Sequence, residues 1–189
     1  MITLSTTRTE PASRAHAFKV ILILLVLSVI SPAAVCADDN SRAPDLGNCQ
    51  RLHAPEGNKV AFHVYAEGVQ IYRWNGTTWT FVAPEATLFA DAGGNGVVGT
   101  HYVGPTWESN SGSKVRGLVL ERCTADPTAI PWLLLRAVSP EGPGIFHQVT
   151  YIQRVNTVGG IAPTSPGNFS GEEARVPYTA EYFFYRAHD

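Results

Sequence analysis

Short runs of alternating apolar and polar residues, separated by turn residues, follow one another from Lys59 almost to the end of the chain. Such runs predict β-strands, because successive side chains of a strand point to opposite faces of its sheet. The same region lacks the apolar spacing of a long amphipathic helix. We therefore expect an all-β fold over residues 58–189, a single-domain antiparallel β-sandwich, with a closed β-barrel as the alternative.

The clearest strand pair surrounds Asn75 and Gly76. Apolar and polar residues alternate over residues 69–74, and a second apolar run follows at 79–83. Asn-Gly is typical of a tight two-residue hairpin turn, in which both residues take positive φ values. We predict a β-hairpin over residues 69–83 with its turn at this pair.

The same reasoning predicts three more strands. Residues 130–139 and 145–156 are rich in apolar and β-branched side chains, and the turn-forming sequence PEGPG joins them. Residues 178–187 alternate aromatic side chains on both faces. We expect a second hairpin and a C-terminal strand.

The N-terminus has the organisation of a secretory signal peptide. Basic residues precede the apolar run 20–30, and small residues lead to Ala37. This run is shorter than the ~20 residues that span a bilayer. We expect a signal peptide over residues 1–37, cleavage after Ala37, secretion or a periplasmic location, and no membrane span after cleavage. Residues 38–57, rich in Asp, Asn, Pro and Gly, are predicted to be an extended lead-in.

Two cysteines, Cys49 and Cys123, lie outside the predicted signal peptide. An even number of cysteines in an oxidising compartment predicts a single disulfide between them. Two free, buried thiols are the alternative.

The net charge and the spacing of one glycine-rich motif indicate which partners and cofactors to expect. Only 16% of the residues are charged and the formal net charge is -2, so we expect no nucleic-acid partner. Residues 94–99, GNGVVG, have the spacing of a dinucleotide-binding loop. That loop must open a helix, whereas here Gly104 and Pro105 follow closely and cannot continue one. We expect no cofactor.

The residues best suited to chemistry lie together in the stretch 99–113. His101, Tyr102, Trp107 and Glu108 are our ligand-binding candidates. His101 and Glu108 are also weak candidates for a metal site, although the stretch lacks the His-x-His spacing of a cupin-like site. No serine elbow or catalytic triad is recognisable, so no catalytic residue is assigned.

Six ordered segments resemble one known family: GVQIYRW, FVAPEATLF, GTHYVGPTWE, AIPWLLL, VTYIQRVNTVGGIAP and VPYTAEYFFY. They are similar to the domain of unknown function 3455, found in exported bacterial and fungal proteins. The resemblance covers about residues 59–186. It implies an exported β-rich domain and no particular activity.

Aromatic residues favour a binding role. The chain has seven tyrosines and four tryptophans, Trp74, Trp79, Trp107 and Trp132. Flat amphipathic rings of this kind stack carbohydrates or hold partner proteins. We predict an exported binding or structural envelope protein with an aromatic-lined ligand groove for a carbohydrate or protein ligand, rather than an enzyme. The alternative is a hydrolase or metal-dependent enzyme using His101 and Glu108, which requires both side chains to face one cavity.

Overall fold

The structure, a computed structural model, describes Met1 and residues 42–188. Apart from Met1, the predicted signal peptide lies outside the described residues, as do residues 38–41 of the lead-in. The part of the chain that is described contains no helix long and apolar enough to cross a membrane.

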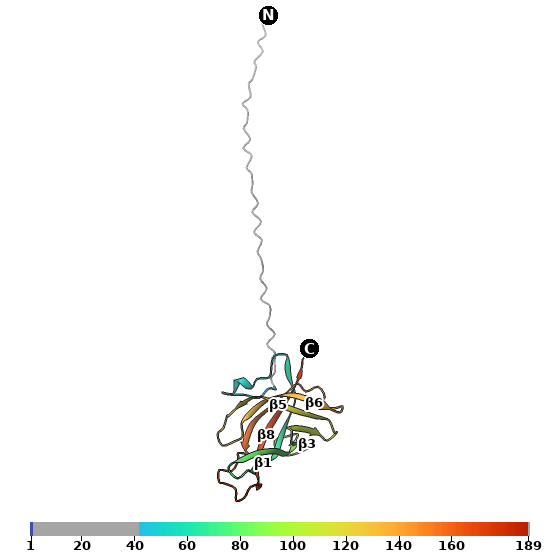
Figure 1. The fold of residues 1–189 in the computed structure, drawn as a ribbon. Coiled ribbons are helices and arrows are strands. Elements are labelled where there is room, and N and C mark those ends of the chain that lie inside the picture. The colour runs from blue at the N-terminus through green and yellow to red at the C-terminus, as the bar shows by residue number, and fades with distance from the viewer. Residues whose placement is uncertain (2–41, 189) are drawn as a thin grey trace. The chain divides into compact units, whose positions relative to one another are not determined.

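The described residues form one antiparallel sheet that closes on itself (Figure 1). Each strand pairs with the next one along the chain, and the last pairs with the first. The strands are β1 (Asn58–Trp74), β2 (Trp79–Phe89), β3 (Val97–Tyr102), β4 (Thr106–Ser109), β5 (Lys114–Cys123), β6 (Trp132–Glu141), β7 (Tyr151–Gly159) and β8 (Glu173–Ala187). The predicted all-β antiparallel class is confirmed, and of the two predicted arrangements the pairing forms the closed barrel.

The first predicted hairpin is confirmed, but its turn is wider than predicted. Trp74 pairs with Trp79, so residues 75–78 connect the strands. Within this connection only Gly76 has a positive φ, of +97°. The Asn75 side-chain oxygen accepts two backbone hydrogen bonds at 2.9 Å and stabilises the longer loop. The prediction of a two-residue turn is therefore wrong.

The second predicted hairpin forms between β6 and β7, but β7 begins at Tyr151 rather than at residue 145. The preceding residues turn so that Phe146 enters the barrel, where it is buried. Its ring centroid lies 5.6 Å from that of Phe62 and 5.1 Å from that of Phe184. These three phenylalanines pack together in the half of the barrel interior near the start of β1.

The lead-in packs against the outside of the barrel. It contains a 3-10 helix, η1 (Gln50–Leu52), and buries Leu46, Cys49 and Leu52. These residues cover outward side chains of β6, β7 and β8, namely Leu134, Val155, Phe183 and Tyr185. The predicted disulfide is confirmed: Cys49 is bonded to Cys123, with a Cα–Cα distance of 5.7 Å. The lead-in and these outward side chains therefore form a second hydrophobic core, the outer core, on the outside of the barrel.

The glycine-rich segment at residues 94–99 leads into strand β3. Gly94 and Gly96 have positive φ values in the connection from β2, and pairing with β2 starts at Val97. Because a strand follows instead of a helix, the backbone geometry of a dinucleotide-binding loop is not formed here.

Candidate ligand-binding cavity

The four candidate residues occupy the β3–β4 hairpin, which turns at residues 103–105 as Gly104-Pro105 predicts. His101 pairs directly with Trp107 across this hairpin. Because side chains alternate along a strand, these two point to the same face, and Tyr102 and Glu108 point to the other. His101 is 2% exposed and Trp107 is 1% exposed, which identifies their face as the barrel interior.

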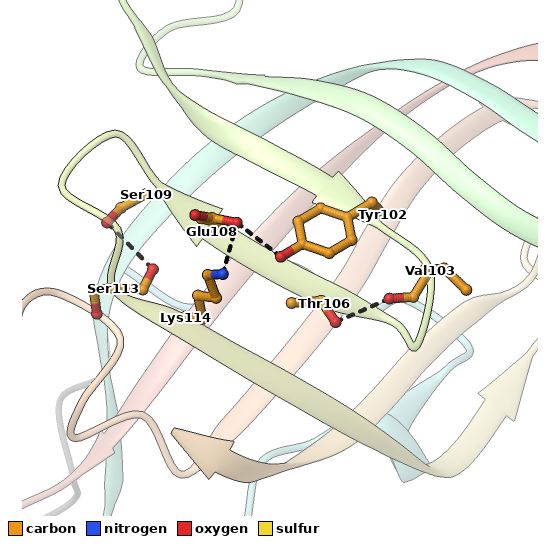
Figure 2. Close-up of polar contacts among 7 residues, drawn as sticks. All are labelled: Tyr102, Val103, Thr106, Glu108, Ser109, Ser113 and Lys114. Carbon is orange, nitrogen blue, oxygen red and sulfur yellow. Dashed lines mark hydrogen bonds and ion pairs between the residues drawn. The ribbon is translucent and has the colours of Figure 1, made fainter. Parts of the chain in front are cut away.

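Tyr102 and Glu108 form a polar contact on the outer face, shown in Figure 2. The Tyr102 hydroxyl donates a hydrogen bond to Glu108 Oε2 at 2.7 Å, and Lys114 Nζ lies 3.4 Å from the same oxygen. The tyrosine hydrogen bond and the lysine charge both lower the pKa of Glu108. This carboxylate is therefore engaged in a surface network that links β3, β4 and β5.

His101 is held in one tautomer inside the barrel. Its Nδ1 lies 2.8 Å from the Thr106 carbonyl oxygen, which can only accept a hydrogen bond. Nδ1 therefore carries the hydrogen, and Nε2 carries the lone pair. The ring stacks on Trp107 with centroids 4.3 Å apart, and its centroid lies 5.1 Å from that of Tyr182. Burial lowers the pKa of His101 to about 3, so the ring is neutral at physiological pH.

The four candidates are thus brought together in two pairs. His101 and Trp107 share the interior, Tyr102 and Glu108 share the outer surface, and the sheet separates His101 from Glu108. Among the described residues, no group of three or more His, Cys, Asp and Glu side chains is placed to hold a metal ion.

A cavity of about 660 Å³ occupies the barrel interior beside His101 and Trp107. Its walls are largely apolar and include Val119, Ile130, Leu133 and Leu135. The cavity extends to exposed side chains on β2 and the β3–β4 turn, namely Phe81, Val82 and Val103. These exposed apolar residues form its rim, at the barrel end opposite the phenylalanine cluster.

Three inward polar side chains from other strands also line this cavity: Gln70 on β1, Arg154 on β7 and Tyr182 on β8. Arg154 pairs with Tyr182 across neighbouring strands. Its guanidinium donates from Nε and Nη2 to the Pro131 carbonyl, at 3.2 and 2.7 Å. Among the residues that line the cavity, Gln70 Nε2, Trp107 Nε1 and Tyr182 Oη are buried and make no well-formed hydrogen bond. The Tyr178 hydroxyl lies beside Gln70 and Tyr182, and Tyr182 also lies beside Arg154, so these side chains interact only weakly with one another. The cavity therefore has polar groups available to a ligand.

Gln70, Arg154 and Tyr182 were not predicted from the sequence as site residues. Strand alternation offered a signal, since Arg154 lies two residues after Ile152 and shares its inward face. A charged residue on an apolar strand face is unusual enough to mark a candidate site.

We expect His101 to make stability depend on pH. Its pKa is about 3 in the folded protein and 6.5 when unperturbed, so the unfolded chain binds a proton first as the pH falls. The stability that neutral His101 contributes is present above pH 6.5 and is lost towards pH 3, at about 1.4 kcal/mol per pH unit. From pH 7 to pH 5, urea unfolding should show the wild type losing about 2 kcal/mol more than His101→Gln.

The matched control for this measurement is His147→Gln, because His147 is exposed. The free energy of unfolding of the His147→Gln variant should change with pH as that of the wild type does. Parallel profiles for the wild type and His101→Gln would contradict the buried neutral state of His101.

A closed antiparallel β-barrel with a partly polar internal cavity is the class of protein that these observations define. Over residues 55–186 the sequence matches the family model described as "Protein of unknown function (DUF3455)". The chain belongs to this family, as the six sequence segments indicated. Neither the search of curated proteins nor the search of solved structures found a match.

Proposed function

We propose that this protein is an exported binding protein that holds a small organic molecule inside its barrel. The observation that carries the proposal is the internal cavity with unpartnered buried polar atoms on Gln70, Trp107 and Tyr182. Small-molecule sites typically have volumes of roughly 300–1,000 Å³ and combine apolar walls with a few polar groups. A cavity of about 660 Å³ with this lining fits that description.

The unpartnered atoms favour an occupied cavity. A buried polar group without a hydrogen bond costs about 1–3 kcal/mol relative to a satisfied one. A ligand that bonds to Gln70 Nε2 and the Tyr182 hydroxyl recovers part of that cost on binding. The apolar walls add the hydrophobic contribution of a ligand body that leaves water.

The cavity favours a small molecule over a carbohydrate or a protein surface. Stacking of a sugar requires an open indole face, whereas Trp74 and Trp107 are buried, the Trp79 ring centroid lies 5.5 Å from that of Trp74, and Trp132 packs against the outer core. The aromatic residues of the proposed groove are instead the cavity-lining rings of Tyr72, Trp107 and Tyr182.

A binding role is also favoured over the hydrolase or metal-dependent alternative. That alternative needs His101 and Glu108 in one cavity, and they lie on opposite faces of the sheet. Export is supported by the signal-peptide pattern of residues 1–37 and by the Cys49–Cys123 disulfide, which is compatible with an extracellular location.

The proposal can be tested with N-phenyl-1-naphthylamine, a neutral dye whose fluorescence rises in apolar sites. We expect saturable binding to the wild type. Val119 lines the cavity, so Val119→Phe should fill part of it and weaken dye binding at least tenfold, about 1.4 kcal/mol. The matched control is Leu118→Phe, because Leu118 is exposed on the opposite face of the same strand.

Leu118→Phe should bind the dye as the wild type does. Circular dichroism and thermal unfolding establish that both variants are folded. The proposal fails if the wild type does not bind the dye saturably, or if the two folded variants bind it equally well.

A further inference from the structure

Arg154 is a buried cation at the cavity. It is 9% exposed and lines the cavity from β7. Its hydrogen bonds to the Pro131 carbonyl involve a neutral acceptor. Within residues 42–188 no carboxylate forms an ion pair with it, although four other charged or histidine side chains pair with glutamates. An arginine remains protonated at all physiological pH values, so the charge stays in place.

Such a charge is costly to bury alone. Charged side chains in protein interiors are normally paired, because transfer of an ion from water to an apolar environment is unfavourable. The Pro131 carbonyl occupies Nε and one Nη2 hydrogen, and the Tyr182 hydroxyl also lies beside the guanidinium, so the remaining N–H groups have only neutral neighbours. The guanidinium thus offers both charge and hydrogen-bond donors to a ligand.

The groups around Arg154 add further donors. The unpartnered Gln70 Nε2 and Trp107 Nε1 are N–H groups that can only donate, and the Tyr182 hydroxyl can donate as well. Tyr182 links these groups in space, because it pairs with Arg154 across the strands and its ring lies 5.2 Å from that of Trp107. His101 Nε2 and the Gln70 side-chain oxygen are acceptors in the same cavity, but the donors together with the Arg154 charge are complementary to an oxyanion.

The rest of the cavity suits an apolar body. Val119, Leu133 and Leu135 line its walls, and Phe81 and Val103 are exposed at its rim. An inorganic anion would leave this apolar surface uncovered, whereas an organic acid would cover it. The guanidinium of Arg122, exposed near the rim, adds a positive charge that attracts anions.

We infer that the cavity binds an organic acid, with a carboxylate or a related oxyanion bonded to Arg154 and an apolar body directed to the rim. This inference rests on the proposed function, because it specifies the ligand class of the same cavity. It assigns Arg154 as the residue that determines specificity for the charged group.

The test compares two ligands of nearly the same shape, 1-naphthoate and the neutral 1-naphthamide, as competitors of the bound dye. On the wild type, naphthoate should displace the dye at a concentration at least tenfold lower than naphthamide, because a hydrogen-bonded charge pair contributes about 1.5–3 kcal/mol. In Arg154→Gln this preference should disappear. Arg136→Gln is the matched control, since Arg136 is exposed on the neighbouring strand β6 and does not line the cavity.

The outcomes separate this inference from the proposed function. If the dye binds but both competitors act equally, or neither displaces it, the oxyanion site is overturned while binding in the cavity stands. A preference for naphthoate that survives in folded Arg154→Gln also overturns it. If Arg154→Gln does not fold, Arg154→Lys takes its place; it keeps the charge but loses the planar fork, and it should retain a weaker preference for naphthoate. If neither variant folds, the comparison of the two competitors on the wild type decides the inference.

Discussion

Trp107→Ala is expected to lower the free energy of unfolding by about 3–5 kcal/mol, as truncation of a buried aromatic side chain usually does. Trp107 is 1% exposed. Its ring stacks on His101 and contacts Tyr182 and Phe184 edge-on, with centroids 5.2 and 6.0 Å away. Loss of the ring removes all three contacts and enlarges the cavity beside it.

The backbone at Gly117 shows how closely this ring is packed. A Cβ atom added to Gly117 would lie 3.0 Å from the Trp107 ring and 2.8 Å from the Leu135 side chain. A side chain at position 117 would therefore crowd the indole and Leu135.

Urea or guanidinium unfolding at pH 7 measures the effect. Trp107→Phe should lose less than Trp107→Ala, because it keeps an aromatic ring against His101. Phe81→Ala, which removes an exposed ring from the rim of the same cavity, should change stability by less than about 1 kcal/mol. A loss of under 1 kcal/mol for Trp107→Ala would show that this ring is not part of the core.

Local features of the fold could be predicted from the sequence because they depend on nearby residues. The strand at residues 69–74 follows from alternation, and the turn at residues 103–105 follows from the turn-forming pair Gly104-Pro105. Closure of the barrel could not be predicted in this way. It depends on pairing between β1 and β8, whose residues Asn58 and Ala187 lie at opposite ends of the domain sequence.

Of the four candidate residues, His101 and Trp107 line the cavity and Tyr102 and Glu108 do not, for a related reason. His101 and Glu108 were considered together because they are close in sequence, but the three-residue turn pairs His101 with Trp107 and so directs Glu108 outward. The length of that connection sets the register, and a shift by one residue would exchange the faces.

Arg154 was overlooked because both faces of β7 are buried. Gln153 and Val155 point outward, yet the lead-in covers them: Gln153 donates a hydrogen bond to the Leu52 carbonyl at 2.5 Å, and Val155 belongs to the outer core. Polarity therefore does not separate the inner face of this strand from the outer one. Alternation places Arg154 on the same face as Ile152, but the sequence does not show which of the two buried faces is the inner one.

The disulfide has the second large expected effect. Replacement of both Cys49 and Cys123 by alanine should lower the free energy of unfolding by about 4 kcal/mol, because the bridge links residues 74 positions apart and restricts the unfolded chain. The same bridge holds the lead-in, with Leu46 and Leu52, against the outside of β6–β8. Its loss therefore also weakens the outer core.

Urea unfolding of the oxidised wild type and the double variant measures this difference, and thiol labelling under denaturing, non-reducing conditions should find no free cysteine in the mature wild type. Leu52→Ala, with the disulfide intact, isolates the packing contribution of the lead-in and should lose about 2–5 kcal/mol as a buried leucine. Because the bridge lies outside the barrel, the double variant, while folded, should still bind N-phenyl-1-naphthylamine as the wild type does. Two free thiols in the wild type, or a loss of less than 1 kcal/mol in the double variant, would contradict a stabilising bridge between the lead-in and β5.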